Sequence, residues 1–142
     1  MKVTHSTKPG RTEDVERKWH LIDIKGKVLG RVISDITSLL QGKQKAGYSP
    51  NIDSGDCVVV INAAQLVVTG NKLKSKVYTR YSGYPGGLAS QVLGDKLRLR
   101  PTEVVHHAVS GMLPKNKLRD VRMGRLFIYK DNNHPHQDKF KN

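Results

Sequence analysis

Apolar residues recur with two different periods near the start of the chain. From Trp19 to Ile24 apolar and polar residues alternate, which is the period of a half-buried β-strand. Between Leu29 and Leu40 apolar residues recur at helical spacing instead, and Gly42 is placed to end that helix. A strand followed at once by an amphipathic helix is the opening of a βαβ unit, so the pattern predicts an α/β fold.

The middle of the chain predicts more strands. A loop rich in Gly, Pro, Ser, Asn and Asp spans 43–56 and leads to the unbroken apolar run Val58–Ile61. Such a run is typical of a strand that is covered on both faces, as in a parallel sheet. Leu66–Thr69 and Lys76–Tyr81 are further strand candidates on either side of a turn, and Gly83–Gly87 must be a loop.

Helical spacing returns in the second half of the chain. We expect one helix around Val92–Arg100 and another from Pro101 to Met112, because proline suits a first turn and Pro114 stops the pattern. A short helix at Leu118–Met123 then precedes a last strand, Leu126–Tyr129. The alternation of strands and helices is that of a single α/β domain.

The domain is expected to carry an extension at each end. Residues 1–18 are predicted to form a flexible basic N-terminal arm, and residues 131–142 a loose polar C-terminal tail. The α/β domain itself is assigned to residues 19–130. The sequence contains no internal repeat and no interdomain linker.

Charge narrows the possible partners. Lys and Arg number 25 against 12 acidic residues, which gives a net charge of +13 and a field that attracts polyanions. No helix pairs a basic face with Trp or Phe, which argues against a membrane, and the N-terminus lacks the apolar stretch of a secretory signal. The single cysteine, Cys57, can form no internal disulfide, which fits a reducing compartment. We therefore expect a cytoplasmic protein that binds nucleic acid.

The cations gather in two stretches of the chain. Residues 72–81 contain four cations and no acid, interleaved with two tyrosines, and residues 115–130 contain six cations and a single acid, Asp120. Segregated cations of this kind suit a surface that tracks phosphates, and tyrosines can stack on unpaired bases. A solvated face with tyrosines in the core is the alternative interpretation of the same pattern.

Motifs for catalysis, cofactors and metals are incomplete. Gly42 and Gly47 have P-loop spacing, but the phosphate-binding lysine is missing and the segment follows a helix. The His134-Pro135-His136 sequence lacks further metal ligands, and Asp53 and Asp56 are explained by a turn. We therefore expect no enzyme, no cofactor and no small-molecule substrate, although an RNA-modifying enzyme or a free RNA chaperone remains an alternative.

Short blocks of residues follow one another in a characteristic order over roughly 17–136. The blocks are Trp19-x-x-Ile22-Asp23, Gly30-Arg31, Gly42-Lys43-x-Lys45, Tyr48-x-Pro50, Asp53-x-Gly55-Asp56, Val60-x-Asn62-Ala63, Thr69-Gly70-Asn71-Lys72, Lys76-x-Tyr78, Ser82-Gly83-Tyr84-Pro85-Gly86-Gly87, Ala108-Val109-x-Gly111-Met112-Leu113-Pro114-Lys115-Asn116, Tyr129 and His134-Pro135-His136. As a set they resemble the bacterial form of the large-subunit ribosomal protein family numbered thirteen. The chain departs from the family pattern at Tyr81, where His is usual, and at Leu118-Arg119-Asp120, where Leu-Gly-Arg is common.

The resemblance implies a three-layer α/β/α domain around a short, mainly parallel four-stranded sheet. It also implies a structural constituent of the large ribosomal subunit that contacts large-subunit rRNA and neighbouring ribosomal proteins, and that helps early subunit assembly by bridging RNA segments electrostatically. The RNA-facing residues that it implies are Lys43, Lys45, Tyr48, Lys72, Lys76, Ser82, Gly83, Tyr84, Lys115 and Asn116. Charge and ring chemistry add Lys74, Tyr78, Arg80, Lys117, Arg119, Arg122, Arg125, His134 and His136.

Overall fold

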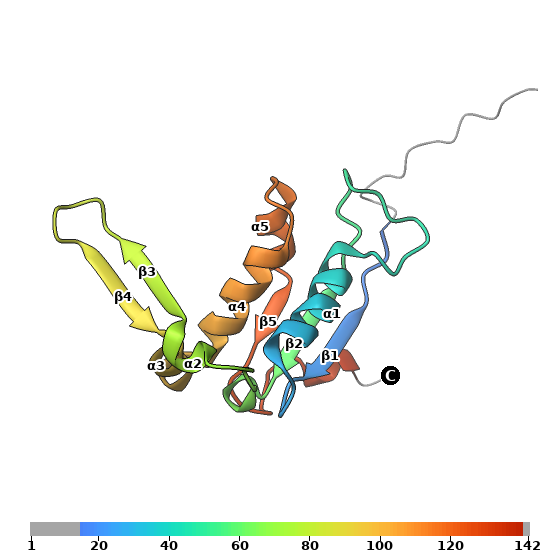
Figure 1. Cartoon of the computed structure of the whole chain (residues 1–142). Coiled ribbons are helices and arrows are strands. Elements are labelled where there is room, and N and C mark those ends of the chain that lie inside the picture. The colour runs from blue at the N-terminus through green and yellow to red at the C-terminus, as the bar shows by residue number, and fades with distance from the viewer. Residues whose placement is uncertain (1–14, 141–142) are drawn as a thin grey trace, which may run out of the picture.

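A parallel three-stranded sheet forms the centre of the computed structural model, which describes residues 15–140 (Figure 1). The strand order is β1 (Trp19–Asp23), β2 (Cys57–Ile61), β5 (Leu126–Ile128), so that β2 lies in the middle. The register pairs Val59 with Leu21 on one side and with Phe127 on the other. The unbroken apolar sequence of β2 is explained by this central position, because Val58, Val59 and Val60 are fully buried.

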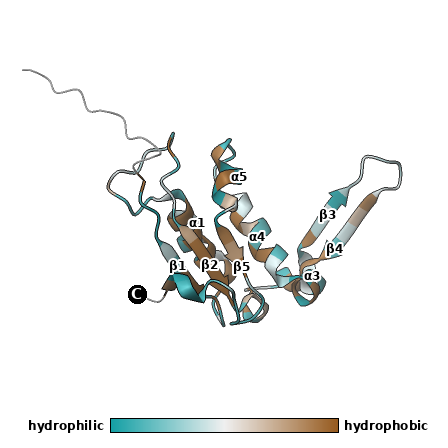
Figure 2. Ribbon diagram, turned by 180° about the vertical axis from the view of Figure 1, so that it is seen from behind, coloured by the Kyte–Doolittle hydropathy of each residue, from teal (hydrophilic) through white to brown (hydrophobic). Residues whose placement is uncertain are grey.

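Two helices, α1 (Leu29–Gln41) and α4 (Pro101–Met112), cover one face of this sheet (Figure 1). Their apolar stripes meet Val58 and Val60 of β2 in a single hydrophobic core, to which α1 contributes Ile36 and α4 contributes Val105. Figure 2 shows the hydrophobic residues concentrated on the central strands and the inner sides of the helices. The spacing that predicted both helices is therefore the spacing of their buried face.

Shorter elements connect these main ones. They are η2 (Ala63–Gln65), α2 (Lys72–Ser75), α3 (Leu93–Leu99) and α5 (Leu118–Met123). The predictions of α3, α5 and β5 are confirmed, with ends that differ by a residue or so. None of the helices within residues 15–140 has the length and apolarity needed to span a bilayer.

A two-stranded antiparallel hairpin projects from the body (Figure 1). It consists of β3 (Val77–Tyr81) and β4 (Leu88–Val92), with Thr79 opposite Ser90. The expectation of a four-stranded sheet is wrong, because within residues 15–140 the central sheet has three strands and these two pair only with each other. The strand expected at Leu66–Thr69 is also not formed, and that segment makes a single bridge from Val67 to Val28.

The C-terminal tail packs against the second face of the sheet. Phe127 stacks on Trp19 with ring centroids 5.6 Å apart, and the His136 ring lies 4.5 Å from that of Phe127. The last turn, η3 (Gln137–Phe140), brings Phe140 edge-on to Trp19 at 6.5 Å. The expectation of a loose tail is therefore corrected for residues 131–140. Residues 1–14 of the predicted N-terminal arm and 141–142 of the tail lie outside the described residues.

Candidate nucleic-acid interface

The predicted RNA-facing cations fall into two groups that differ in their partners. Those of the first group are exposed and form no ion pair with an acidic residue within the described chain: Lys43, Lys72, Lys74, Lys76, Arg80, Lys115 and Lys117. In the second group, Lys45, Arg122 and Arg125 are held by carboxylates of the protein itself, whereas Arg119 only approaches its exposed neighbour Asp120. The first group and Arg119 can therefore meet an external anion.

The turn between α4 and α5 presents two of the unpaired cations. Leu113 is buried and anchors the end of α4, and the backbone N–H of Leu118 donates to Asn116 Oδ1 at 3.1 Å, which fixes the start of α5. Lys115 and Lys117 are exposed on either side of Asn116. Arg119 follows, partly buried and 3.8 Å from its neighbour Asp120. This turn lies at the same end of the body as the loop after α1 (Figure 1).

The base of the hairpin presents the next group. Lys72 and Lys74 stand on the short helix α2, and Lys76 follows it directly. Tyr78 is half-buried, with Lys76 Nζ 5.4 Å and Lys96 Nζ 4.7 Å from its ring centroid. The ring of His107 lies edge-on to the Tyr78 ring, with the two centroids 5.3 Å apart. Burial raises the pKa of Tyr78, so its hydroxyl stays protonated and can donate a hydrogen bond.

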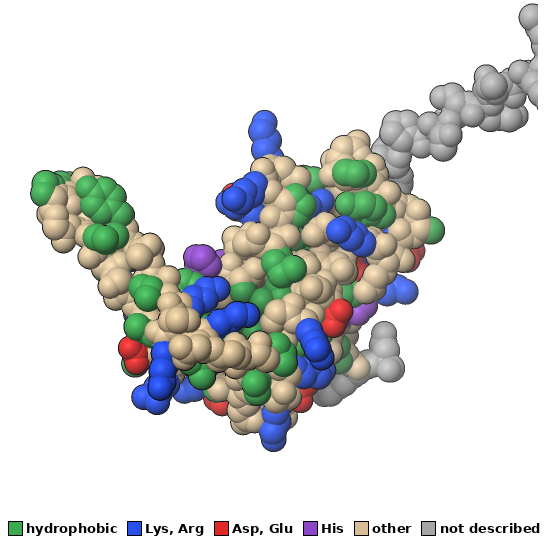
Figure 3. All heavy atoms as spheres, viewed as in Figure 1, with side chains coloured by type: hydrophobic (Ala, Val, Ile, Leu, Met, Phe, Trp, Pro, Cys, Tyr) green, Lys and Arg blue, Asp and Glu red, His purple; other side chains and the backbone are tan. Residues whose placement is uncertain are grey.

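The tip of the hairpin differs from the rest of this basic protein because it carries no charge. From Tyr81 to Val92 there is neither a Lys or Arg nor an Asp or Glu. Tyr84 is 76% exposed and Tyr81 is 64% exposed, while the turn is closed by the Gly87 N–H donating to Tyr84 O at 2.9 Å. Figure 3 shows hydrophobic side chains at the end of this arm. Ser82 and Gly83 are exposed in the same turn.

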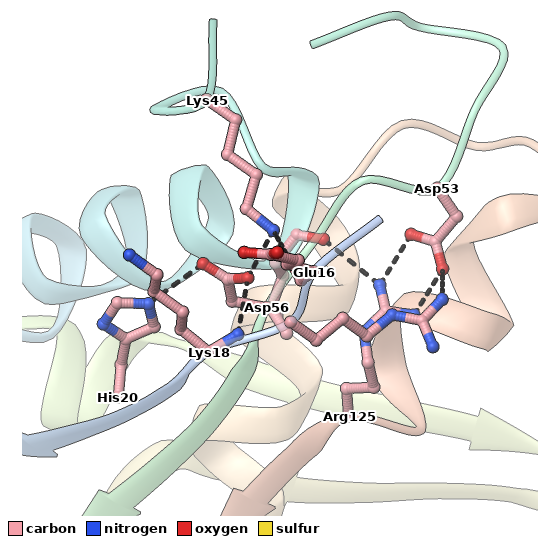
Figure 4. Close-up of polar contacts among 9 residues, drawn as sticks. Glu16, Lys18, His20, Lys45, Asp53, Asp56 and Arg125 are labelled. Atoms are coloured by element: carbon pink, nitrogen blue, oxygen red, sulfur yellow. Dashed lines mark hydrogen bonds and ion pairs between the residues drawn. The ribbon is translucent and has the colours of Figure 1, made fainter. Parts of the chain in front are cut away.

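The loop 43–56 is fastened to the body by Asp56 (Figure 4). This carboxylate accepts from Lys45 Nζ at 2.6 Å, from His20 Nε2 at 3.0 Å and from the Lys18 N–H at 3.1 Å. Burial alone would raise the pKa of Asp56, but these donors outweigh it and hold the pKa below its ordinary value. Lys45 also donates to Glu16 O at 2.6 Å, so its charge is already engaged inside the protein.

Two glycines allow this loop to close on the end of α1. Gly42 adopts a left-handed conformation with φ 76°, which ends the helix as the sequence predicted. Gly55 lies so close to α1 that an added Cβ would fall 1.8 Å from Leu40 O. Any side chain at position 55 would therefore collide with the backbone.

Arg122 and Arg125 are buried around Asp53 and do not reach the surface. The Arg125 guanidinium forms a two-point contact with the Asp53 carboxylate, with Nη2 2.6 Å from Oδ1 (Figure 4). Arg122, 1% exposed, has its Nε 3.6 Å from Asp53 Oδ1. Arg17 approaches the same carboxylate at 3.8 Å. Burial would raise the pKa of Asp53, but its hydrogen bonds with Arg125 and the surrounding arginines keep it below its ordinary value.

These positions correct the assignment of both arginines as phosphate contacts. A guanidinium inside the protein cannot meet a phosphate on its surface, whereas it can neutralise a buried carboxylate. Sequence reasoning explained Asp53 and Asp56 by a turn and missed this role. The available signal was that the two acids stand alone, without a cation, between positions 53 and 71.

The two histidines of the tail and Tyr48 are also less available than predicted. His134 is buried, with its ring 5.9 Å from those of Tyr129 and Phe140. His136 is partly buried between Trp19 and Phe127. Both rings pack the second face of the sheet, so a direct phosphate contact by His134 is withdrawn. Tyr48 is partly buried in the loop after α1.

Comparison with known proteins identifies the family. The model of the family described as ribosomal protein L13 matches residues 17–135, most of the chain. The chain belongs to the ribosomal protein L13 family. It is 48% identical over 127 residues to the large ribosomal subunit protein uL13 of Thermoanaerobacter sp. (strain X514), covering 89% of each chain. It is 45% identical over 132 residues to that of Geobacter sulfurreducens, covering 93% of this chain and 92% of the relative.

Membership of the L13 family confirms the resemblance that the ordered sequence blocks carry. It also confirms the prediction that the chain is not an enzyme, since the relatives are ribosomal proteins. The mixed α/β fold with a parallel sheet agrees with the predicted fold class.

Proposed function

We propose that this L13-family chain is a structural constituent of the large ribosomal subunit in the cytoplasm, where it contacts large-subunit rRNA and neighbouring ribosomal proteins. The observation that carries the proposal is the family match, which spans the body, the hairpin and the first part of the tail. The net charge of +13 supports it, because a protein with this field associates with polyanions.

The unpaired cations give the proposal its mechanism. An exposed lysine without an acidic partner can bind a phosphate and release a counterion, whereas a lysine already bound to a carboxylate gains less from the exchange. The cations at the α4–α5 turn and those at the hairpin base lie on different parts of the molecule (Figures 1 and 3). One protein can thus neutralise two RNA segments that would otherwise repel each other, which favours early subunit assembly.

The proposed RNA-facing set is smaller than the one that the sequence suggested. It keeps the exposed members and leaves out Arg122, Arg125 and His134, which are buried. Lys45 is left out as well, because it is bound to Asp56. The retained set is Lys43, Lys72, Lys74, Lys76, Arg80, Ser82, Gly83, Tyr84, Lys115, Asn116, Lys117 and Arg119, with Tyr48, Tyr78 and His136 as partly exposed ring contacts.

Assembly kinetics test this function. Replacing Lys115, Lys117 and Arg119 by Ala together should slow formation of large subunits while leaving the unfolding of the isolated protein nearly unchanged, because Lys115 and Lys117 are exposed and Arg119 is only partly buried. The rate is measured by pulse-labelling rRNA and following its entry into mature large particles.

A matched control removes the same charge elsewhere. Lys25, Lys27 and Arg98 are exposed and lie outside the proposed contact set, so their joint replacement by Ala should leave the rate near wild type. Equal slowing by both triple variants would mean that net charge alone matters. Normal kinetics in the first variant would reject the assigned surface.

A further inference from the structure

A hollow of about 580 Å³ opens between the hairpin base and the two helices that cover the sheet. Its walls come from four separate stretches of the chain: the first turn of α1, the stretch from Val68 through α2 to the start of β3, Leu93 at the start of α3, and the second half of α4. Its volume lies within the range of small-molecule sites, about 300–1,000 Å³. No sequence motif indicates this hollow, because no single motif contains its lining.

The polar lining of the hollow is entirely cationic or neutral. Arg31, Lys72 and Lys76 border it, and no Asp or Glu of the part of the chain that the structure describes does. None of these three cations forms an ion pair within residues 15–140. Figure 3 shows Lys and Arg side chains and a histidine where the hairpin meets the body. A ligand with negative charge at its edge is favoured here.

The inner lining is apolar and includes aromatic rings. Met112 at the end of α4 is 50% exposed, and Ala108 and Gly111 lie on the same stretch of the helix. The Tyr78 and His107 rings, in edge-to-face contact, also face the hollow. Absence of a side chain at Gly111 leaves space, since nothing lies within 4 Å of where its Cβ would be. An apolar surface with rings and a thioether suits a flat heterocycle.

We propose that this hollow holds one unstacked nucleotide, with its base against Met112 and the Tyr78–His107 pair and its flanking phosphates on Arg31, Lys72 and Lys76. A site that combines cations with an apolar interior suits a nucleotide better than it suits a bare phosphate or a purely apolar ligand. The inference rests on the proposed function, because the nucleotide is taken to belong to rRNA. A base splayed out of its stack is the form in which proteins recognise single-stranded RNA.

Crosslinking in wild-type particles tests the site directly. Large subunits that contain the protein are irradiated with ultraviolet light, and crosslinked peptide–nucleotide adducts are identified by mass spectrometry. We expect adducts on peptides that contain Tyr78 or residues 107–112, each to the same rRNA nucleotide. Two outcomes would overturn the inference and leave the proposed function intact. In the first, particles that contain the protein yield RNA adducts only at other peptides. In the second, these peptides form adducts with protein instead of RNA. Absence of the protein from the particles would instead reject the proposed function.

Matched variants test the chemistry of the site. Arg31→Ala with Met112→Ala removes one rim cation and one interior side chain, and neither belongs to the proposed RNA-facing set. Arg98→Ala with Leu99→Ala removes one arginine and one exposed apolar side chain outside the hollow. The first pair should lower the adduct yield at Tyr78 roughly tenfold, the loss expected when a charged hydrogen bond is removed, and the control pair should not. Equal yields in both would overturn the inference.

A further measurement separates an RNA nucleotide from a free one. The isolated protein, labelled on its methionine methyl groups, is titrated with adenosine monophosphate, with a single-stranded pentanucleotide and with inorganic phosphate. A nucleotide site of RNA predicts that the pentanucleotide shifts the Met112 signal at a lower concentration than the monophosphate, and that phosphate leaves it unchanged. Tighter binding of the monophosphate would point to a free nucleotide and contradict the rRNA assignment.

Discussion

The arginines at the end of α5 and just after it and the lysines beside the hairpin carry the same charge but have opposite environments. Arg122 and Arg125 lie inside the body around Asp53, whereas Lys72, Lys74 and Lys76 are exposed and have no acidic partner in the described chain. The first group stabilises the fold, and the second is available to an external polyanion. The partner of a cation, and not its residue type, therefore decides its role in this protein.

The largest effect is expected from removing the shared carboxylate. Asp53→Ala leaves Arg122 and Arg125 buried without a counter-charge, and the loss of one member of such a cluster typically destabilises a protein by about 3–5 kcal/mol. Urea unfolding of the purified chain measures the change. A loss below about 1 kcal/mol would mean that water, or a movement of α5, solvates the unpaired arginines. The distinction between the two groups of cations would then weaken.

Acidification should also destabilise the body, by a smaller amount. The pKa values of Asp53 and Asp56 lie below the ordinary value of 3.8 in the folded protein. Their stabilising contribution is therefore complete above that value and is lost as the pH falls through the lower, folded pKa values. Unfolding free energies measured from neutral pH to about pH 2 should fall steeply below the ordinary pKa. Asp56→Asn should flatten this dependence, and an unchanged profile would contradict the assigned ion pairs.

The smallest effect on stability is expected at the hairpin tip. Tyr84→Ser and Leu88→Ser alter residues that are 76% and 65% exposed, so each should change the unfolding free energy by no more than about 0.5 kcal/mol. The same variants should reduce retention of the protein in large subunits, since the tip is part of the proposed contact surface. A stability loss comparable to that of Asp53→Ala would show that the tip supports the fold instead.

The same contrast explains how much of the fold the sequence could predict. The elements β1, α1, β2, α4 and β5 were found because their buried faces impose a clear apolar period. The strand β4 was missed because Leu88, Ala89 and Ser90 are all exposed, so no burial shapes its sequence. The tail was expected to be loose because most of its residues are polar. Its few rings form an aromatic cluster only together with Trp19 and Phe127, which are distant in the sequence or in another element.

The candidate site was predicted less well than the fold, for a physical reason. Clusters of lysine and arginine indicate a basic surface, but the sequence does not reveal which cations find a carboxylate from a distant segment. Asp53 is 72 positions from Arg125, and the pair forms only when the loop closes on α1 through Gly55. The hollow beside the hairpin depends on four separated segments and could not be recognised from spacing either.

The central claim is that the unpaired cations bind this protein to large-subunit rRNA, and its most direct test is co-sedimentation of the tagged chain with purified large subunits as the salt concentration is raised. The account predicts one copy for each particle at physiological salt. A variant with Lys72, Lys74 and Lys76 replaced by Ala should leave the particles at a lower salt concentration than the wild type, because it makes fewer phosphate contacts. Release of both proteins at the same salt concentration would contradict the claim.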